Sequence, residues 1–569
     1  MNLKSFVFFL AVMFTNSLIA QDAAPDNWFN LDEGEGGVLG VSADKLYNGL
    51  LKNKTGETVI VAIIDSGVDA EHEDLKDVMW VNPGEIPGNG IDDDNNGYVD
   101  DIHGWNFIGG KNGNIDKDNL EITRLYRKYH KQFKDVTPSS LSTKDKALYA
   151  EYKKMEKEVE EARQGASEQL AQMESTKLII MEALDEVAKK LDGKAPNAAN
   201  IKEIVPGDNR SLIVGKNIIQ DLLSQGEEFA SLDAMKEMYT TEIQGALDYY
   251  DTQANYQYNP DFDPRQSIVG DNYDNQTEKS YGNNDVEGPD AFHGTHVAGI
   301  VAAVRNNEIG MNGVADNVQI MSVRAVPDGD ERDKDVANAI RYAVDNGASI
   351  INMSFGKGYS WNKKIVDDAV RYAEKKDVLL VHAAGNSHEN TDIANNFPND
   401  KFEKKKFFGK KEARNWIEVG ALSWRGGENA AANFSNYGKE NVDLFAPGTA
   451  IYSTTPDNNY GDAQGTSMAS PVVAGVAAII RSYFPKLSAR QVKSILMDSV
   501  VPLTQNVAKP GDADTKVPFS QLSVSGGVVN ALKAAEKAAK TKGKRKAKLS
   551  AQQAAKTKGR MNKKTQNKA

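Results

Sequence analysis

Cysteine is absent from this chain of 569 residues. That absence excludes disulfide-stapled scaffolds, zinc–thiolate sites, iron–sulfur clusters and a cysteine nucleophile. It also excludes a lipid anchor on an N-terminal cysteine. With 40% hydrophobic and 26% charged residues, the composition is that of a globular protein and not of a fibrous or wholly disordered one.

Long apolar runs are also absent, apart from one near the N-terminus. Lys4 precedes the apolar residues 6–14, and the segment closes at Leu18-Ile19-Ala20. A bilayer span needs about 20 apolar residues, so this shorter run is typical of a secretory signal peptide. We expect residues 1–20 to be removed and the mature protein to act in the periplasm or outside the cell, without a membrane span. Bound calcium could then stabilise a fold that has no disulfides.

Positive charge is scarce overall, since the net charge is −12, but it is concentrated at the C-terminus. Residues 533–569 hold 14 Lys and Arg, one acidic residue, Glu536, and no aromatic residue. This composition favours a basic, mostly disordered tail. The alternative is electrostatic contact with the cell envelope, another polyanion or the acidic body of the protein. We expect no sequence-specific binding of nucleic acid.

Apolar runs of strand length recur along the rest of the chain, and amphipathic helical patterns lie between them. The strand-like runs are 58–64, 318–323, 348–353 and 378–383, and helical patterns occupy 336–344 and 365–373. Buried strands that alternate with helices predict an α/β fold with a parallel sheet covered on both faces. In such sheets, functional residues gather at the carboxyl ends of the strands.

One block has a different composition. After Ser142 and Asp145, which resemble a helix-capping pair, apolar residues repeat every three or four positions from Leu148 to Val159 and again from Leu170 to Leu191. This periodicity predicts helices with one apolar face, paired as antiparallel hairpins. We therefore expect a helical insertion at 118–253, between two parts of one domain at 21–117 and 254–532.

Three short motifs, far apart in the sequence, carry residue types that suit nucleophilic catalysis. Asp65 ends a buried strand, His-Gly-Thr-His-Val-Ala-Gly at 293–299 opens an apolar helix, and Gly-Thr-Ser-Met-Ala-Ser-Pro at 465–471 opens another. A glycine, a serine at a helix N-terminus and a proline in the first turn form a strong local signal. Each motif alone has an ordinary structural explanation, such as a turn or a helix cap. Together they fit a serine nucleophile with a base and an orienting carboxylate.

With these motifs, the chain resembles the subtilisin family of serine peptidases, in which the triad runs in the order Asp, His, Ser. Further similar segments are 61–69, 72–75, 352–356 and 383–386, and the resemblance covers about 41–47, 58–75 and 290–500. It implies a three-layer α/β domain with a parallel sheet. It also implies an exported serine endopeptidase that cuts proteins or peptides through an acyl-enzyme intermediate, without an organic cofactor.

The resemblance also implies a role for each matching residue. Ser467 would attack the scissile carbonyl, His293 would accept and return the proton, and Asp65 would orient the imidazole. Asn386 would donate a hydrogen bond to the oxyanion, beside the backbone N–H of Ser467. The substrate backbone would pair as an added strand with the segment Ser354, Phe355 and Gly356.

Two metal sites have to be considered. His293 and His296 could form a zinc pair on one helix face, but no Glu or Asp lies at a zincin spacing. The loop 92–103 places oxygen-bearing side chains at positions 1, 3, 5 and 9 and glycine at position 6, as a calcium loop does. The predicted calcium ligands are Asp92, Asp94, Asn96 and Asp100. Position 12 is His103 instead of the usual glutamate, and an ion-free turn rich in Asp and Asn is the alternative.

The spacing of the motifs departs from the family. Asp65 and His293 are 228 positions apart, whereas the corresponding residues of subtilisin are about 32 positions apart. We expect the extra residues to emerge near the site and to form a cap that restricts substrate access. Two rival interpretations are an inactive relative that binds a partner through the insertion and tail, and a module that binds polysaccharide or envelope through the tail.

Overall fold

The computed structural model describes residues 23–25, 27–403 and 411–545. The expected signal peptide, residues 1–20, and the tail beyond residue 545 lie outside these ranges. No helix in the described ranges combines the length and the hydropathy that crossing a bilayer requires.

Nine strands of the described chain form one sheet in the order β12-β15-β9-β8-β7-β6-β1-β5-β2. Their bounds are Val59–Asp65 (β1), Gly104–Asn106 (β2), Val318–Arg324 (β5), Ile350–Met353 (β6), Leu379–Ala383 (β7), Trp416–Leu422 (β8), Leu444–Pro447 (β9), Val501–Pro502 (β12) and Gly527–Val528 (β15). All neighbouring pairs are parallel except β12 with β15. The predicted parallel sheet is confirmed.

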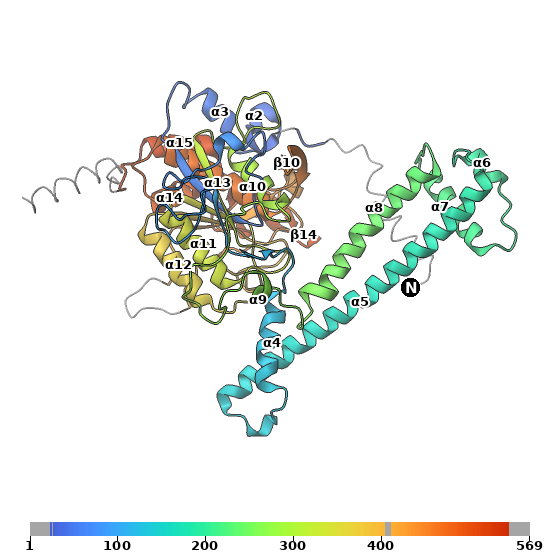
Figure 1. The fold of residues 1–569 in the computed structure, drawn as a ribbon. Coiled ribbons are helices and arrows are strands. Elements are labelled where there is room, and N and C mark those ends of the chain that lie inside the picture. The colour runs from blue at the N-terminus through green and yellow to red at the C-terminus, as the bar shows by residue number, and fades with distance from the viewer. Residues whose placement is uncertain (1–22, 26, 404–410, 546–569) are drawn as a thin grey trace, which may run out of the picture.

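Helices cover both faces of this sheet (Figure 1). One layer contains α10 (Phe292–Ala302), α13 (Thr466–Tyr483), α14 (Ala489–Asp498) and α15 (Ala531–Ala539), and the other contains α11 (Asp333–Asp345) and α12 (Lys363–Lys375). Each layer packs on its own apolar core against the sheet. The three-layer α/β architecture therefore agrees with the prediction.

The N-terminal segment packs on the same layer as α13. It contains η1 (Trp28–Asn30), α2 (Glu33–Gly36) and α3 (Ala43–Asn48). Trp28 is buried, and its indole N–H donates to the carbonyls of Thr449 and Ala450 at 3.1 and 2.9 Å. This segment is thus part of the three-layer α/β domain around the nine-stranded sheet, which we call the body.

The block with the helical pattern forms five helices in the described chain. They are α4 (Glu121–Phe133), α5 (Thr143–Leu191), α6 (Ala198–Glu203), α7 (Arg210–Ser224) and α8 (Leu232–Asp251). As the sequence indicated, the Ser142 side chain caps α5, accepting from the backbone N–H of Asp145. We call α5 to α8 the arm, and α4 with residues 143–163 of α5 its base.

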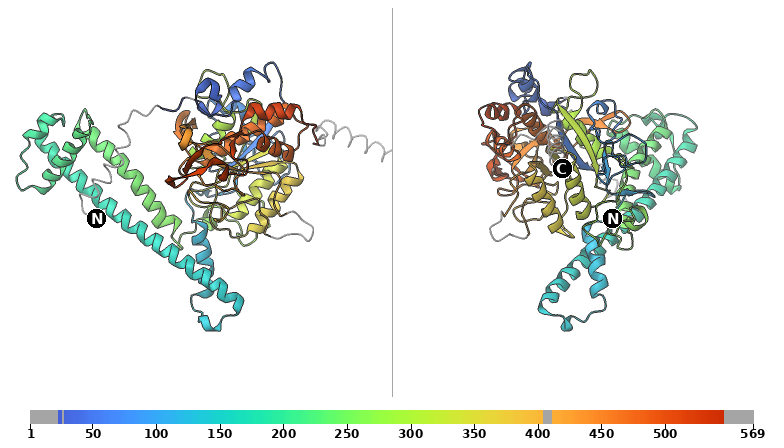
Figure 2. Two further views of the ribbon diagram at one scale, coloured as in Figure 1. Left: turned by 180° about the vertical axis from the view of Figure 1, so that it is seen from behind. Right: turned by 60° about the vertical axis from the view of Figure 1, so that its left-hand side comes forward.

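The arm projects from the body as a long rod (Figures 1 and 2). Helices α7 and α8 both pack on α5. Their shared core includes Leu184, Ile219 and Met235. At the base, a second apolar cluster joins α4 to α5 through Tyr126, Phe133 and Tyr152 among others. The apolar stripe read from the sequence is therefore buried between helices.

The remaining elements are short. They are β3 (Gly109–Gly110), β4 (Gly113–Asn114), β10 (Ile451–Thr455), β11 (Asn459–Ala463), β13 (Asn506–Lys509), β14 (Asp512–Pro518), α9 (Arg265–Ile268), η2 (Lys76–Val78), η3 (Pro138–Ser140), the π-helical turn η4 (Thr252–Gln257), η5 (Gly427–Asn429) and η6 (Phe519–Gln521).

The tail begins later than the sequence boundary at residue 533 suggested. Helix α15 runs through that boundary, and Ala534, Ala535 and Ala538 are buried in the main core. Asn530 caps the helix, since its side chain accepts from the backbone N–H of Lys533 at 2.9 Å. The low-complexity composition concealed a helix that buries one alanine-rich face.

Candidate active site

Asp65 and His293, which are remote in sequence, lie in contact. Strand β1 lies between β5 and β6, the point where the strand order reverses, and Asp65 is its last residue. His293 is the second residue of α10. Its Nδ1 lies 2.6 Å from Asp65 Oδ1. The carboxylate is 2% exposed, whereas the imidazole is 38% exposed, so the pair has one buried and one accessible end.

The charge of Asp65 controls the imidazole. Burial works to lower the pKa of His293, but the charge and hydrogen bond of Asp65, with a further contribution from Asp290, outweigh it and raise the pKa above its ordinary value of 6.5. Because Nδ1 faces a carboxylate, the neutral ring carries its proton there and leaves Nε2 as the basic atom. The ring is thus set up to accept a proton at Nε2.

Ser467 is the second residue of α13, a helix that packs against α10. Its Oγ donates to the backbone carbonyl of Ser354 at 3.1 Å. Among the described residues, no hydrogen bond joins Ser467 Oγ to His293. Where a serine and a histidine act together as nucleophile and base, the contact between them is often looser before substrate is bound.

The first turn of α13 is held by Asn352 in β6 and by Ser354, which follows β6. Pro471 has no N–H, so the carbonyl of Ser467, four residues earlier, lacks its helical partner. The Ser354 hydroxyl fills that place, donating to the Ser467 carbonyl at 2.8 Å. Asn352 donates to Ser354 Oγ at 2.9 Å and accepts from Ser470 Oγ at 2.8 Å. These bonds fix the turn that carries Ser467.

Asn386 lies just beyond β7 with one side of its amide already used. Its Oδ1 accepts from the N–H and the hydroxyl of Thr466, both at 2.9 Å. A Cβ built on Gly465 would lie 3.4 Å from Asn386 Nδ2 and 3.5 Å from the backbone N of Ser467. The two N–H donors thus flank one small space, and glycine at 465 keeps it open.

The segment Ser354–Gly356 has a free backbone edge. Among the described residues, no hydrogen bond uses the backbone N–H or C=O groups of Phe355 or Gly356. The next residue, Lys357, does pair in both directions with Phe397. Unpaired backbone groups in an extended segment are what an added strand requires.

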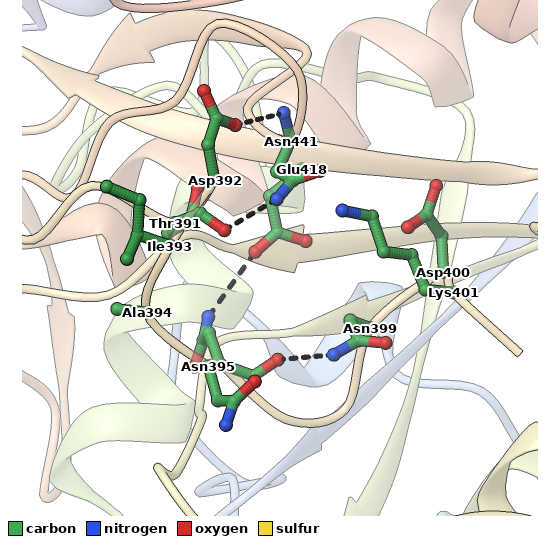
Figure 3. Close-up of a pocket in the computed structure, with 11 residues that line it drawn as sticks. Thr391, Asp392, Ile393, Ala394, Asn395, Asn399, Asp400, Lys401, Glu418 and Asn441 are labelled. Carbon is green, nitrogen blue, oxygen red and sulfur yellow. Dashed lines mark hydrogen bonds between the residues drawn. The ribbon is translucent and has the colours of Figure 1, made fainter. Parts of the chain in front are cut away.

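A polar pocket of about 130 Å³ is lined in part by Asn396, which lies close to Gly356. Figure 3 shows the side chains that line this pocket. A Cβ built on Gly356 would lie 2.4 Å from Asn396 Oδ1, and Asn396 Nδ2 donates to Ala384 O at 3.0 Å and to Glu418 Oε1 at 3.3 Å. The pocket lining also includes Asp392 and Asp400. The pocket beyond Asn396 is therefore lined in part by acidic side chains.

His296 does not join His293 in a metal pair. Its ring is fully buried, and Nε2 lies 3.1 Å from the carbonyl of Gly461. Burial lowers the pKa of His296 to about 4. The histidine is a neutral core residue at ordinary pH.

The acidic loop brings together a donor set that differs in part from the sequence prediction. Ligand oxygens of Glu85, Asp92 and Asp94 all lie within 4.8 Å of one another. Asn96 Oδ1 instead accepts from the N–H of Tyr98 at 2.8 Å, and Asp100 accepts from the N–H of Gly90 at 2.8 Å. All five side chains accept hydrogen bonds within this part of the chain, and the three clustered carboxylates supply the hard oxygen donors that calcium prefers.

Sequence reasoning missed the supporting residues of the site. The bond from Ser354 to α13 was detectable in principle, since Pro471 leaves a predictable carbonyl without a partner. Thr466 carried no separate signal. Glu85 lies outside the spacing of a calcium loop, and only the fold brings it to Asp92.

Comparison with known proteins matches residues 56–521 to the profile of the peptidase S8 subtilase family. The thermophilic serine proteinase of Bacillus sp. (strain AK1) is 42% identical over 191 residues, which is 33% of this chain and 42% of that protein. Subtilisin DY of Bacillus licheniformis is 38% identical over 215 residues, 37% of this chain and 71% of that protein.

Among solved structures, a protease from Pseudoalteromonas arctica aligns with a TM-score of 0.36 and 29% identity, covering 45% of this chain and 78% of its own. The chain spans about two fifths of the length of the Bacillus AK1 proteinase. The profile match, by contrast, extends over most of the chain and across every motif described above. The chain belongs to the subtilase family of serine peptidases.

Proposed function

We propose that this protein is an exported serine endopeptidase with Ser467 as nucleophile, His293 as general base and Asp65 as the group that orients the base. The observation that carries the proposal is the 2.6 Å contact between Asp65 and His293, made at the sheet edge from which α13 presents Ser467. His293 Nε2 takes the proton of Ser467 Oγ as Oγ attacks the scissile carbonyl, and then returns it to the leaving amine. Water repeats the sequence on the acyl-enzyme.

The same geometry supports the proposed binding roles. The space between Asn386 Nδ2 and the Ser467 N–H suits the oxyanion, because both donors are fixed before the reaction begins. The free edge of Phe355 and Gly356 suits the substrate backbone, and the strand would extend N-terminally from the scissile bond. Protein or peptide substrates follow from this arrangement.

Covalent labelling tests the nucleophile directly. A fluorophosphonate probe should modify the purified protein at Ser467, and casein hydrolysis should fall on the order of 10⁶-fold in kcat for Ser467→Ala, the size of loss established in subtilisin. Ser482→Ala is a matched control, because Ser482 is a buried serine of the same helix, remote from its N-terminus, and should keep parental labelling. A parent that resists the probe would support the inactive partner-binding relative instead.

We further propose that Glu85, Asp92 and Asp94 hold a structural calcium ion. Each carboxylate also accepts backbone N–H groups, for example Asp92 from Gly97 at 2.9 Å and Glu85 from Asp94 at 3.1 Å, and keeps lone pairs for a cation. Calcium at 100 times its Kd should stabilise the fold by about 2.7 kcal/mol, so Tm should fall on addition of a chelator. Glu85→Gln should shrink this shift, whereas Asp100→Asn should preserve it. A Tm that ignores the chelator in the parent would refute the site.

Export rests on the apolar segment that precedes residue 21. We propose a periplasmic or extracellular location after removal of residues 1–20. N-terminal sequencing of the protein recovered from culture supernatant or periplasm should begin at Gln21, and recovery of the intact N-terminus would contradict this.

A further inference from the structure

We propose that the base of the arm positions the substrate-binding segment Ser354–Gly356, so that the arm is part of the machinery that aligns substrate. This inference rests on the proposed function and deepens it. The link runs through Lys357 and through the loop 358–362, which follow the segment directly.

Lys357 ties the end of the segment to α4. Its backbone N–H and C=O pair with Phe397 at 3.0 and 2.9 Å. Its side chain is 1% exposed, and Nζ lies 2.9 Å from Asp333 Oδ1 and 3.8 Å from Glu121 Oε2. Glu121 is the first residue of α4. A buried ammonium is costly unless its partners stay in place, so Lys357 is held directly by Asp333 and is coupled to the start of α4 through the longer ion pair with Glu121.

The start of α4 is in turn fixed to the body. Arg124, one turn along, is fully buried, bonds the Glu121 carboxylate and donates to the carbonyl of Asp330 at 3.0 Å. Asp118, just before the helix, pairs with Arg332 at 2.7 and 2.8 Å. These buried pairs make the base a rigid support and leave little freedom for the segment beyond Lys357.

The loop after Lys357 packs directly on the base. Tyr359 and Trp361 join the apolar cluster of α4 and α5. Lys128 Nζ of α4 lies 3.9 Å from the centre of the Trp361 ring, and the Tyr359 hydroxyl donates to Glu158 of α5 at 3.3 Å. The arm therefore contacts this loop through both of its base helices.

The unpaired backbone of Phe355 and Gly356 links the base of the arm to substrate binding. Since Phe355 and Gly356 have no backbone partner in the described protein, their position is set by their flanks: Ser354, held to α13, and Lys357, held to the arm base. A displacement of about 1 Å in such a positioning element can cost up to about 10²-fold in rate. Loosening the base should thus impair extended substrates and spare the reacting groups.

The test compares two substrates on full-length variants. A tetrapeptide anilide needs the segment, whereas p-nitrophenyl acetate needs only the reacting groups. For Trp361→Ala, we expect the ratio of kcat/KM for the anilide to kcat/KM for the ester to fall about 5- to 20-fold, mostly through KM, with ester hydrolysis within about twofold of the parent. Phe484→Ala is the control: it removes a partly buried aromatic at the far end of α13 and should leave the ratio unchanged.

An unchanged ratio in Trp361→Ala, or an equal loss with both substrates, would overturn the inference. Should that variant not fold, the same ratio of kcat/KM values is measured for the double variant Lys128→Met/Tyr359→Phe. This variant removes only the contact of Lys128 with Trp361 and the hydrogen bond of Tyr359 to Glu158. Fluorophosphonate labelling of the parent separates the two proposals. A labelled parent with an unchanged ratio rejects the positioning role alone, and an unlabelled parent rejects the peptidase.

Discussion

Asp65 has an asymmetric carboxylate. Oδ1 accepts from the backbone N–H of Ser66 at 2.8 Å and faces His293, while Oδ2 is buried without a hydrogen-bond partner in the described chain. The interaction with His293 is therefore made by one oxygen whose orientation is set by its own backbone. At the level of single residues, the electrostatics of the site depend on this contact.

Replacing this carboxylate should change both rate and pH dependence. Asp65→Asn should lower kcat roughly 10⁴-fold, because the amide favours the wrong imidazole tautomer. In the proposed mechanism catalysis needs neutral His293, so activity should be lost as the pH falls through the pKa of His293, which Asp65 raises. Without that charge the pKa drops, and the acid limb of kcat/KM should move to lower pH.

The pH profile of kcat/KM checks this for the parent and the variant. Asp290→Asn is the matched control: Asp290 also raises the pKa of His293, but by its charge alone, whereas Asp65 adds a hydrogen bond to the ring. It should shift the acid limb slightly downward and keep kcat near the parental value. An acid limb at the same pH in Asp65→Asn would contradict the assigned role.

Among the elements, α13 has an unusual first turn. Pro471 has no N–H to donate to the carbonyl of Ser467. The hydroxyl of Ser354, which follows β6, donates to that carbonyl instead. The proposed nucleophile is thus held by the side chain of Ser354, the first residue of the proposed substrate-binding segment. In this proposal the reacting serine and the substrate-binding segment share one anchor.

A double-mutant cycle measures this anchor. Ser354→Ala should destabilise the fold by about 1–3 kcal/mol, because it leaves the Ser467 carbonyl without a donor. Pro471→Ala restores a backbone N–H to that carbonyl, so Ser354→Ala should cost less in its presence. Urea unfolding in the Ser467→Ala background, which prevents self-digestion, gives the four free energies. Strictly additive effects would show that the hydroxyl does not replace the missing N–H.

The same elements show how far sequence reasoning reaches. Buried apolar runs predicted the parallel strands, and the rule that chemistry lies at their carboxyl ends predicted a functional role for Asp65 at the end of β1. The residues after β6 and β7 were assigned only through the resemblance to the subtilisin family. Periodicity also predicted the apolar face of α5. These inferences rest on local patterns, which a sequence displays directly.

What the sequence did not reveal depends on contacts between remote segments. Lys357 and Glu121 are buried together only because the fold packs the start of α4 against the segment that follows β6, and a lysine in isolation predicts an exposed side chain. Glu85 was missed for another reason: it lies seven positions before Asp92, outside the spacing of a calcium loop. The alanines of α15 were assigned to a low-complexity tail, because the sequence alone does not show that one face of this helix packs in the core.

At the scale of the whole molecule, the body is rounded, whereas the arm is long and narrow (Figure 1). Helix α5 has 49 residues, which is about 74 Å at 1.5 Å per residue. A compact chain of about 545 residues would have a radius of gyration of about 24 Å. Small-angle scattering should therefore give a larger radius than this, and a value of about 24 Å would mean that the arm lies against the body.

The projecting rod also affects how the protein behaves in a chromatography column. Elution from a gel-filtration matrix reports hydrodynamic radius, and globular calibration standards lack such an appendage. A single chain should elute ahead of standards of equal mass and could be mistaken for a dimer. Light scattering or sedimentation equilibrium, which weigh particles without regard to their outline, should assign one chain the mass of one chain.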